Sequence, residues 1–298
     1  MEYAFSPETW AVIKFGYEAL SYVWGTAQNP SRAYVSCSNA SSQGVISIGQ
    51  NLDVALRHLR YETEPRRLWI DALCIDQTNL NERSSQVSIM DKVYSIATRT
   101  VAWLGPNRNS DETITLLQGL SQIVEFEFPF RQIRPIAEDP AGWADSSVPM
   151  PWHEDQLRDI LTFIARPYFG RVWIQQELLL ARDIEFQCGF VKIAERVLWN
   201  GLGCVRSKGV SHPNVTYTNT FNQEWNLVWP RIVDLIQNRL ARLRTAQTPV
   251  DHIPLSNIRL ISRELGCQDP RDRIYAFLGL LPDQDRAGLF TKRGRHIH

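Results

Sequence analysis

The sequence predicts an α/β fold in which helices flank a parallel sheet, with a helical C-terminal part. Two observations lead to this prediction. Between residues 19 and 104, short apolar segments alternate with amphipathic ones, as in βαβ units, whose strands run parallel. Beyond about residue 205, the apolar residues recur at helical spacing instead. The helices predicted there cover 223–243, 255–265 and 270–281.

The first elements follow from local patterns. Residues 19–24 are mostly apolar and stop at Gly25, which predicts a buried strand. The apolar residues within 52–60 recur at i, i+3, i+4 and i+7, which predicts a short amphipathic helix. Residues 68–71 begin a second strand, which is apolar enough to be covered on both faces.

The next segment, residues 79–98, is predicted to be one helix that packs on the sheet. Asn79 can cap its first turn, and one apolar stripe should face the sheet. That stripe consists of Val87, Met90, Tyr94 and Ala97. Residues 100–104 predict a third strand, which ends at Gly105.

The rest of the α/β part is less regular. Residues 126–152 hold five of the sixteen prolines and show no periodicity, which predicts a long loop or lid. A helix over 171–182 and a strand over 184–188 follow. Because the composition shifts near residue 205, we expect an α/β domain at 1–205 and a helical extension packed on it at 206–298.

The composition argues against several classes of protein. There are 32 basic and 32 acidic side chains, and a net charge of zero is not typical of a nucleic-acid binder. No stretch approaches the roughly 20 apolar residues of a membrane span, and the N-terminus lacks the pattern of a secretory signal. The five cysteines are odd in number and include no Cys-x-x-Cys, which favours reduced cytosolic thiols over disulfides or zinc ligands. We therefore expect a cytoplasmic protein without a metal site.

The sequence also lacks the common motifs of enzymes and cofactor sites. It contains no glycine-rich dinucleotide or phosphate loop, no Gly-x-Ser-x-Gly and no His-Glu-x-x-His. We therefore expect no bound cofactor. Two small groups of residues remain as candidates for function.

The first group is a pair of aspartates that follow the second predicted strand. In open α/β sheets, ligands bind at the carboxyl ends of the strands, so Asp71 and Asp76 are candidates for a catalytic or binding role. The alternative is that both residues shape the turn and cap nearby N–H groups.

The second group lies on a later helix. Trp173, Glu177 and Leu180 share one helical stripe. A carboxylate between a tryptophan and a leucine has reduced solvation, as catalytic carboxylates often do. The alternative is a salt bridge from Glu177 to an arginine such as Arg171 or Arg182.

Four segments resemble one protein family. They are residues 17–25, 68–77, 171–177 and 269–276, with the sequences YEALSYVWG, LWIDALCIDQ, RVWIQQE and DPRDRIYA. In their order and spacing they resemble the fungal heterokaryon-incompatibility (HET) domain, and they extend over most of the chain. The resemblance implies a role in fungal non-self recognition and programmed cell death.

The same segments are similar, more distantly, to TIR domains. This implies a flavodoxin-like parallel sheet. Glu177, four residues after Trp173, is similar to the catalytic glutamate of enzymatic TIR domains, although Ile174 stands where a cysteine often follows the tryptophan. The resemblance thus implies that Glu177 is catalytic. The residues that it implies for substrate binding are Ser21, Tyr22, Trp24, Asp71 and Trp173.

Two biochemical functions fit this resemblance. The first is hydrolysis of the bond between nicotinamide and ribose in NAD, which would be a substrate and not a cofactor. The transition state is cationic, so one carboxylate beneath the ribose could stabilise it. The second is a non-catalytic adaptor that self-associates or binds other death-signalling proteins.

Overall fold

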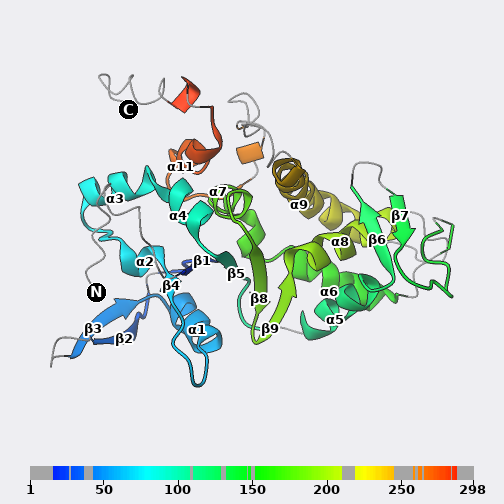
Figure 1. The fold of residues 1–298 in the computed structure, drawn as a ribbon, viewed down its shortest axis with the longest axis horizontal. Coiled ribbons are helices and arrows are strands. Elements are labelled where there is room, and N and C mark those ends of the chain that lie inside the picture. Colours follow the sequence, from blue (N-terminus) through cyan, green and yellow to red (C-terminus); the bar gives the residue numbers. More distant parts are fainter. Residues whose placement is uncertain are drawn as a thin grey trace.

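The computed structural model describes residues 16–26, 28–36, 43–107, 110–128, 132–145, 147–148, 152–209, 219–244, 258, 261–263, 265–282 and 284–286. At its centre lies a five-stranded sheet in the order β4-β1-β5-β8-β9 (Figure 1). Its strands are β1 (Glu18–Tyr22), β4 (Leu68–Trp69), β5 (Arg99–Trp103), β8 (Ile184–Cys188) and β9 (Val191–Ala194). The first four are parallel and β9 is antiparallel to β8, which confirms the predicted fold class. Counted along the chain, these five strands have the 2-1-3-4-5 order of flavodoxin-like sheets.

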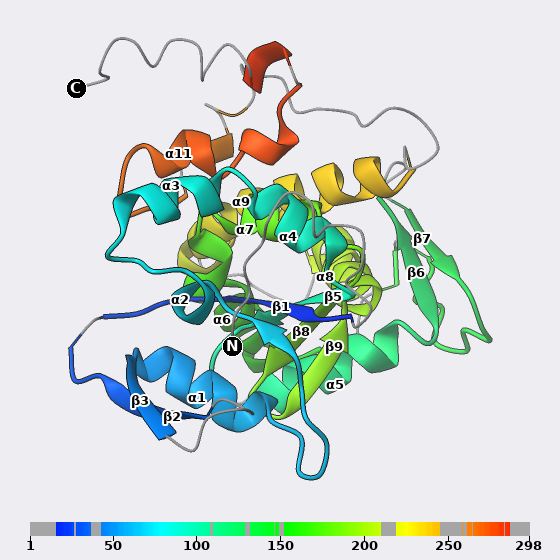
Figure 2. The ribbon, with the colours of Figure 1, turned by 60° about the vertical axis from the view of Figure 1, so that its left-hand side comes forward.

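One face of the sheet is covered by a helix and a small hairpin (Figure 2). These are α1 (Gln50–Leu59) and the antiparallel pair of β2 (Ser31–Ser36) and β3 (Gln43–Ile48). Leu52 of α1 is buried in one apolar cluster with Leu20 of β1. The helix was predicted, whereas the hairpin was not, because its side chains are mostly exposed and carry little apolar alternation.

The opposite face is covered by α4 (Met90–Ile96), and α2 (Asp71–Cys74) and α3 (Leu80–Val87) lead to it from the end of β4. The prediction of a single helix over 79–98 was therefore wrong. The chain leaves helical geometry at the residue before α4, and the carbonyl oxygen of Ser88 accepts a hydrogen bond of 2.9 Å from Arg286 Nη2. Neither proline nor glycine marks this break, so no local signal could have predicted it.

The predicted apolar stripe is nevertheless mostly correct. Met90, Tyr94 and Ala97 are buried in one cluster with Ala19 of β1 and Trp69 of β4. The fourth member, Val87, is only half-buried. The second half of the predicted helix thus packs on the sheet, and the first half, α3, does not.

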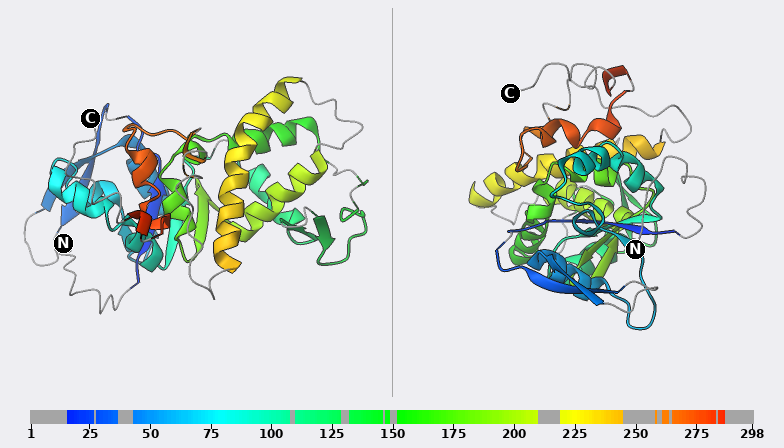
Figure 3. Two further views of the ribbon diagram at one scale, coloured as in Figure 1. Left: turned by 90° about the horizontal axis from the view of Figure 1, so that it is seen from above. Right: turned by 90° about the vertical axis from the view of Figure 1, so that its left-hand side faces the viewer.

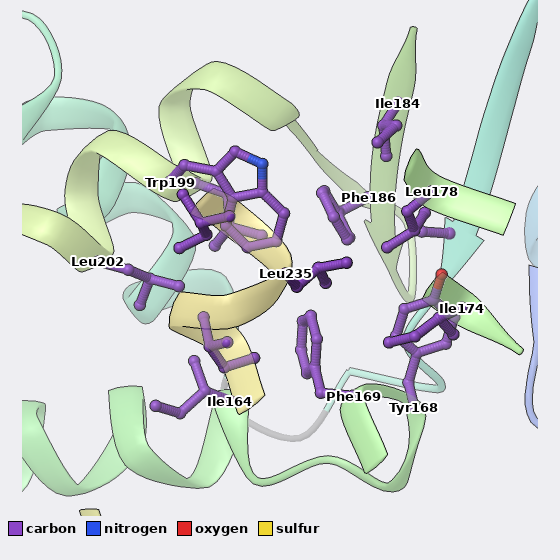
Figure 4. Packing of buried hydrophobic residues seen from close by; sticks show 14 of the residues in the cluster. Ile164, Tyr168, Phe169, Ile174, Leu178, Ile184, Phe186, Trp199, Leu202 and Leu235 are labelled. Carbon is purple, nitrogen blue, oxygen red and sulfur yellow. The ribbon is translucent and has the colours of Figure 1, made fainter. Parts of the chain in front are cut away.

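A group of helices beyond β8 and β9 forms the second half of an elongated molecule (Figure 3). They are α5 (Ser110–Leu120), α6 (Glu154–Ile164), α8 (Glu195–Gly209) and α9 (Asn219–Arg244). In their core, Phe186 of β8 meets Trp199 of α8 edge to face, with ring centroids 5.1 Å apart (Figure 4). The predicted domain boundary at residue 205 falls inside α8, and the division stays a prediction.

The proline-rich segment 126–152 is not wholly a loop. Strands β6 (Val124–Glu127) and β7 (Gln132–Pro135) pair as an antiparallel hairpin, which corrects the prediction for that part. Pro135 belongs to β7, which is an edge strand of a two-stranded sheet, and proline is tolerated on edge strands.

Two short elements bring the chain back to the sheet after α6. The 3₁₀ helix η2 (Pro167–Gly170) and helix α7 (Ile174–Leu179) follow each other there, and α7 packs against α4 and α9. The strand predicted at 184–188 is β8, and the helix predicted at 171–182 is shorter than expected. Within the described residues, no helix is both long and apolar enough to cross a membrane.

The C-terminal segment lies beside α3 and α4 (Figures 1 and 2). It contains α11 (Asp272–Tyr275) and a 3₁₀ turn, η3 (Leu278–Leu280), where one helix over 270–281 was predicted. The helix predicted at 255–265 lies mostly outside the described residues. An isolated parallel bridge joins Arg171 to Gly266, so this segment is hydrogen-bonded to the chain that leads into α7.

Candidate functional site

A cleft of about 780 Å³ opens where β1 and β4 end. Trp24, which follows β1, and Asp71, which follows β4, line one side. The start of α7 contributes Trp173 and Glu177 to the floor, and the C-terminal segment closes the far side. The cleft therefore lies at the carboxyl ends of parallel strands, where open α/β sheets bind their ligands.

Glu177 is the most enclosed charged residue of the cleft, with 2% of its surface exposed. Two hydrogen bonds hold its Oε2: one from the hydroxyl of Ser21 and one of 3.3 Å from Arg171 Nη1. None of the residues that the structure describes forms a hydrogen bond with Oε1. One oxygen of the carboxylate is thus fixed by the protein, and the other is available to a ligand.

A buried hydroxyl chain supports Glu177 from behind. The hydroxyls of Tyr168 and Ser21 lie 2.7 Å apart. Burial raises the pKa of Tyr168 well above its usual value, so the phenol stays protonated and can donate to Ser21. Ser21 in turn donates to Glu177, which fixes the orientation of the carboxylate without any contact from solvent.

Asp71 is held in a similar way at the end of β4. Its Oδ2 accepts a hydrogen bond of 2.8 Å from Trp24 Nε1, and its Oδ1 accepts one of 2.7 Å from the amide of Ala72. Burial first, and then the negative charge of Glu177, raise the pKa of Asp71 to about 6. Arg171 and the two hydrogen bonds lower it, but they do not outweigh burial. Two carboxyl groups of different acidity therefore share the cleft.

Comparison with known proteins shows which family contains the residues of this cleft. The family model described as "Heterokaryon incompatibility protein (HET)" matches residues 17–177. The chain belongs to the heterokaryon incompatibility (HET) family. It is 28% identical over 310 residues to heterokaryon incompatibility protein 6, OR allele, of Neurospora crassa, and the alignment covers 92% of this chain and 44% of that protein. The chain thus spans less than half the length of this curated relative. No solved structure matches the chain.

The part matched by the HET model holds the residues that the sequence singled out. Trp24, Asp71, Trp173 and Glu177 all line the cleft, as expected. Of the two open interpretations of Asp71, the position in a cleft fits a binding role, although its bond to Ala72 is also the local contact that a turn would use.

Two expected substrate-binding residues of this HET-family chain do not line the cleft. Ser21 is buried behind Glu177, where it supports the carboxylate instead of meeting a ligand. Tyr22 is the next residue of β1, so its side chain points to the opposite face and is buried in the cluster with Leu52 of α1. Because side chains alternate along a strand, Ser21 and Tyr22 lie on opposite faces of the sheet.

The contacts expected from the structural alternatives are also present, for Asp76 and for Glu177. Asp76 is exposed and accepts hydrogen bonds from the amide and the hydroxyl of Thr78, so it shapes the turn. Arg171 forms the salt bridge with Glu177. Arg182 does not take part, because it donates to the carbonyl oxygen of Ser95.

The sequence reasoning missed most of the far side of the cleft. Arg231 of α9 lines it, together with Arg271, Asp272 and Tyr275 of the C-terminal segment. The side chain of Trp173 lies close enough to Asp272 to act against the rise in the pKa of that carboxyl, so the two sides approach each other here. The family-like segment 269–276 is the one sequence signal that indicates Arg271, Asp272 and Tyr275, and nothing in the sequence indicates Arg231. The part of the chain described by the structure contains no cluster of His, Cys, Asp or Glu suited to a metal ion.

Proposed function

We propose that this protein acts in fungal heterokaryon incompatibility as a cell-death module, and that its cleft hydrolyses NAD at the nicotinamide–ribose bond. Membership of the HET family and the likeness to heterokaryon incompatibility protein 6 support the first part. The second part rests on the cleft. We also expect the protein to act in the cytoplasm.

One observation carries the enzymatic proposal: Glu177 lines a cleft with one oxygen fixed by Ser21 and Arg171, and no described residue is hydrogen-bonded to the other oxygen. A carboxylate whose position is set before the ligand arrives can stabilise charge without reorganising.

The reaction requires few protein groups. Water adds to C1′ of the ribose while the bond from C1′ to the nicotinamide nitrogen breaks. The electron pair of that bond moves to the nicotinamide ring, which leaves neutral, and the water gives up one proton. Positive charge builds up on the ribose in the transition state, as in glycoside hydrolysis, and Glu177 stabilises that charge.

Asp71 is suited to accept the proton that the attacking water releases. A base works best when its pKa is near the operating pH, and the raised pKa of Asp71, about 6, leaves it ionised but still basic at neutral pH. Asp71 would accept the proton of the attacking water, and Trp24 would hold it in position.

The size and lining of the cleft also fit a dinucleotide. Ligand pockets typically enclose about 300–1,000 Å³, and this cleft has about 780 Å³. Trp24, Trp173 and Tyr275 offer flat surfaces for the nicotinamide and adenine rings, and arginines offer charge for the phosphates.

The direct test is to incubate the purified protein with NAD and to separate the products by chromatography. We expect free nicotinamide and ADP-ribose in equal amounts. If no nicotinamide appears, even when the protein is clustered at high concentration, the enzymatic part of the proposal is wrong.

One observation favours the adaptor as a second function. Glu177 is almost fully buried and ion-paired with Arg171, as a purely structural carboxylate would be. In that case the protein would signal by self-association or by binding other death-signalling proteins. Cell killing that persists in a folded Glu177→Gln variant would support the adaptor.

A further inference from the structure

The far side of the cleft contains a guanidinium group that the proposed chemistry does not use. Arg231 lies on α9, directly after Pro230, and lines the cleft. Its Nε is buried, and no residue that the structure describes accepts a hydrogen bond from it. A buried N–H group without an acceptor is costly, and no described residue offsets that cost for Arg231.

The other arginines of the cleft differ from Arg231. Arg171 is paired with Glu177, and Arg271 is paired with Asp269 through contacts of 2.6 and 3.0 Å. Arg83 is exposed and lies close enough to Asp269 to lower the pKa of that carboxyl. Among the described residues, none forms such an ion pair with Arg231.

The position of Arg231 indicates where a ligand would meet it. Its Nη1 lies beside Gly170, 3.7 Å from the place that a Cβ atom would occupy there. Gly170 is the residue before Arg171, and the bridge to Gly266 is formed at the same point. Arg231 therefore lies toward η2, at the end of the cleft where α9, η2 and the C-terminal segment meet.

We propose that Arg231 binds a phosphate of the nucleotide, so that the cleft selects its substrate by the pyrophosphate group. The planar guanidinium presents parallel N–H groups that match two phosphate oxygens. This inference rests on the proposed function, and it assigns neighbouring parts of the substrate to different elements: the reactive ribose to α7 and the phosphates to α9. The HET model matches only residues 17–177, so this subsite lies outside the matched part.

The test measures binding without turnover. The affinity of the full chain for ADP, adenosine and inorganic pyrophosphate is determined by calorimetry for the wild type, Arg231→Gln and Arg231→Lys. Arg196→Gln is the matched control, because Arg196 is an exposed arginine of α8 that is ion-paired with Glu125. Thermal melting of each variant without ligand confirms that it is folded.

We expect the wild type to bind ADP more tightly than adenosine. Arg231→Gln should weaken ADP binding about tenfold or more, which corresponds to the loss of a charged hydrogen bond, and should leave adenosine binding unchanged. Arg231→Lys should fall between the two, because it keeps the charge and loses the planar fork. If Arg231→Gln does not fold, the comparison of Arg231→Lys with the wild type serves as the test. Arg196→Gln should behave like the wild type.

Equal ADP affinity in Arg231→Gln and the wild type would overturn the inference, as would a wild type that binds ADP no better than adenosine. The NAD assay separates this result from the proposed function. A phosphate preference that depends on Arg231, together with no release of nicotinamide, would keep the subsite and reject hydrolysis. We expect Arg231→Gln to hydrolyse NAD with a raised KM and a similar kcat. If this variant hydrolyses NAD with an unchanged KM, the protein is an NAD hydrolase but Arg231 does not bind the phosphates.

Discussion

The two sides of the cleft are built in different ways. On the sheet side, Glu177 is held by hydrogen bonds from the buried Ser21 and the half-buried Arg171, and the strands beneath it are covered on both faces. Asp71 is held by the backbone amide of Ala72 and by the indole of Trp24, which is 39% exposed. On the C-terminal side, the charged groups are more open: in the pair of Arg271 and Asp269, the side chains are 62% and 37% exposed.

This difference separates two tasks. Groups that stabilise a transition state must be in place beforehand, and burial with hydrogen bonds fixes the carboxylates in that way. Groups that recognise phosphates can sit on long, more exposed side chains, because they act by charge. The comparison therefore predicts large effects for changes on the sheet side and smaller ones on the C-terminal side.

The largest effect is expected for Glu177→Gln. The variant keeps the shape of the side chain but removes the charge that stabilises the cationic transition state, so nicotinamide release per folded molecule should fall about a hundredfold or more. Stability should fall as well, because Arg171 loses its partner. Activity assays and thermal melting on one preparation measure both.

Two controls separate charge from folding in this test. Glu125→Gln changes an exposed ion-paired glutamate and should alter neither property. The double variant Glu177→Gln with Arg171→Gln should regain stability without regaining activity. If the folded fraction of Glu177→Gln turns over at the wild-type rate, Glu177 is not catalytic.

Met90→Ala tests the packing beneath the carboxylates. Met90 is 6% exposed and belongs to the cluster with Ala19 and Trp69. Its truncation should lower the free energy of unfolding by about 2–5 kcal/mol, as determined by denaturant titration. Leu80→Ala, at a residue of α3 that is 66% exposed, should cost no more than about 0.5 kcal/mol. Equal stability of the Met90 variant and the wild type would mean that this side is not tightly packed.

The third prediction compares how the stability of the wild type and of Asp71→Asn depends on pH. The pKa of Asp71 is about 6 in the folded protein and about 3.9 in an unfolded chain. The folded state therefore binds the proton more tightly, and this residue adds stability as the pH falls from 6 to 4. Relative to Asp71→Asn, the wild type should gain about 2 kcal/mol between pH 7 and pH 4. A constant difference across this range would show that the carboxyl is not perturbed.

The smallest effect is expected on the C-terminal side. Because Arg271 and Asp269 are both exposed, Arg271→Gln should change the free energy of unfolding by about 0–1 kcal/mol. Thermal melting is sufficient to detect a larger change. A loss of more than about 2 kcal/mol, outside the range of exposed ion pairs, would mean that both sides of the cleft are equally rigid.

The sequence was sufficient to predict those features that depend on local patterns of residues. The four parallel strands were visible because each is a short apolar segment followed by a turn, and the carboxylates were found because they follow such strands or belong to a family-like segment. Arg171 appeared only as one of two partners considered for Glu177. Arg231 could not be found, because a single arginine in a long amphipathic helix carries no signal of its own.

The remaining errors have tertiary causes. The break between α3 and α4 involves Arg286, which is far away in the sequence and bonds the carbonyl oxygen of Ser88. Strand β9 was missed because Gly189, with a φ of 59°, turns the chain back directly after β8. Such a tight turn leaves too few residues for a separate pattern.

The place of β8 in the sheet affects where the chain can be cut. The segment matched by the HET model stops at residue 177, whereas β8 starts at Ile184 and pairs along the length of β5. A fragment that ended at residue 177 would leave β5 as a bare edge, with unpaired backbone groups that invite association with other chains. Its aggregation would reflect a missing strand and say nothing about the activity of the protein. Fragments meant for expression therefore need to extend at least through β9.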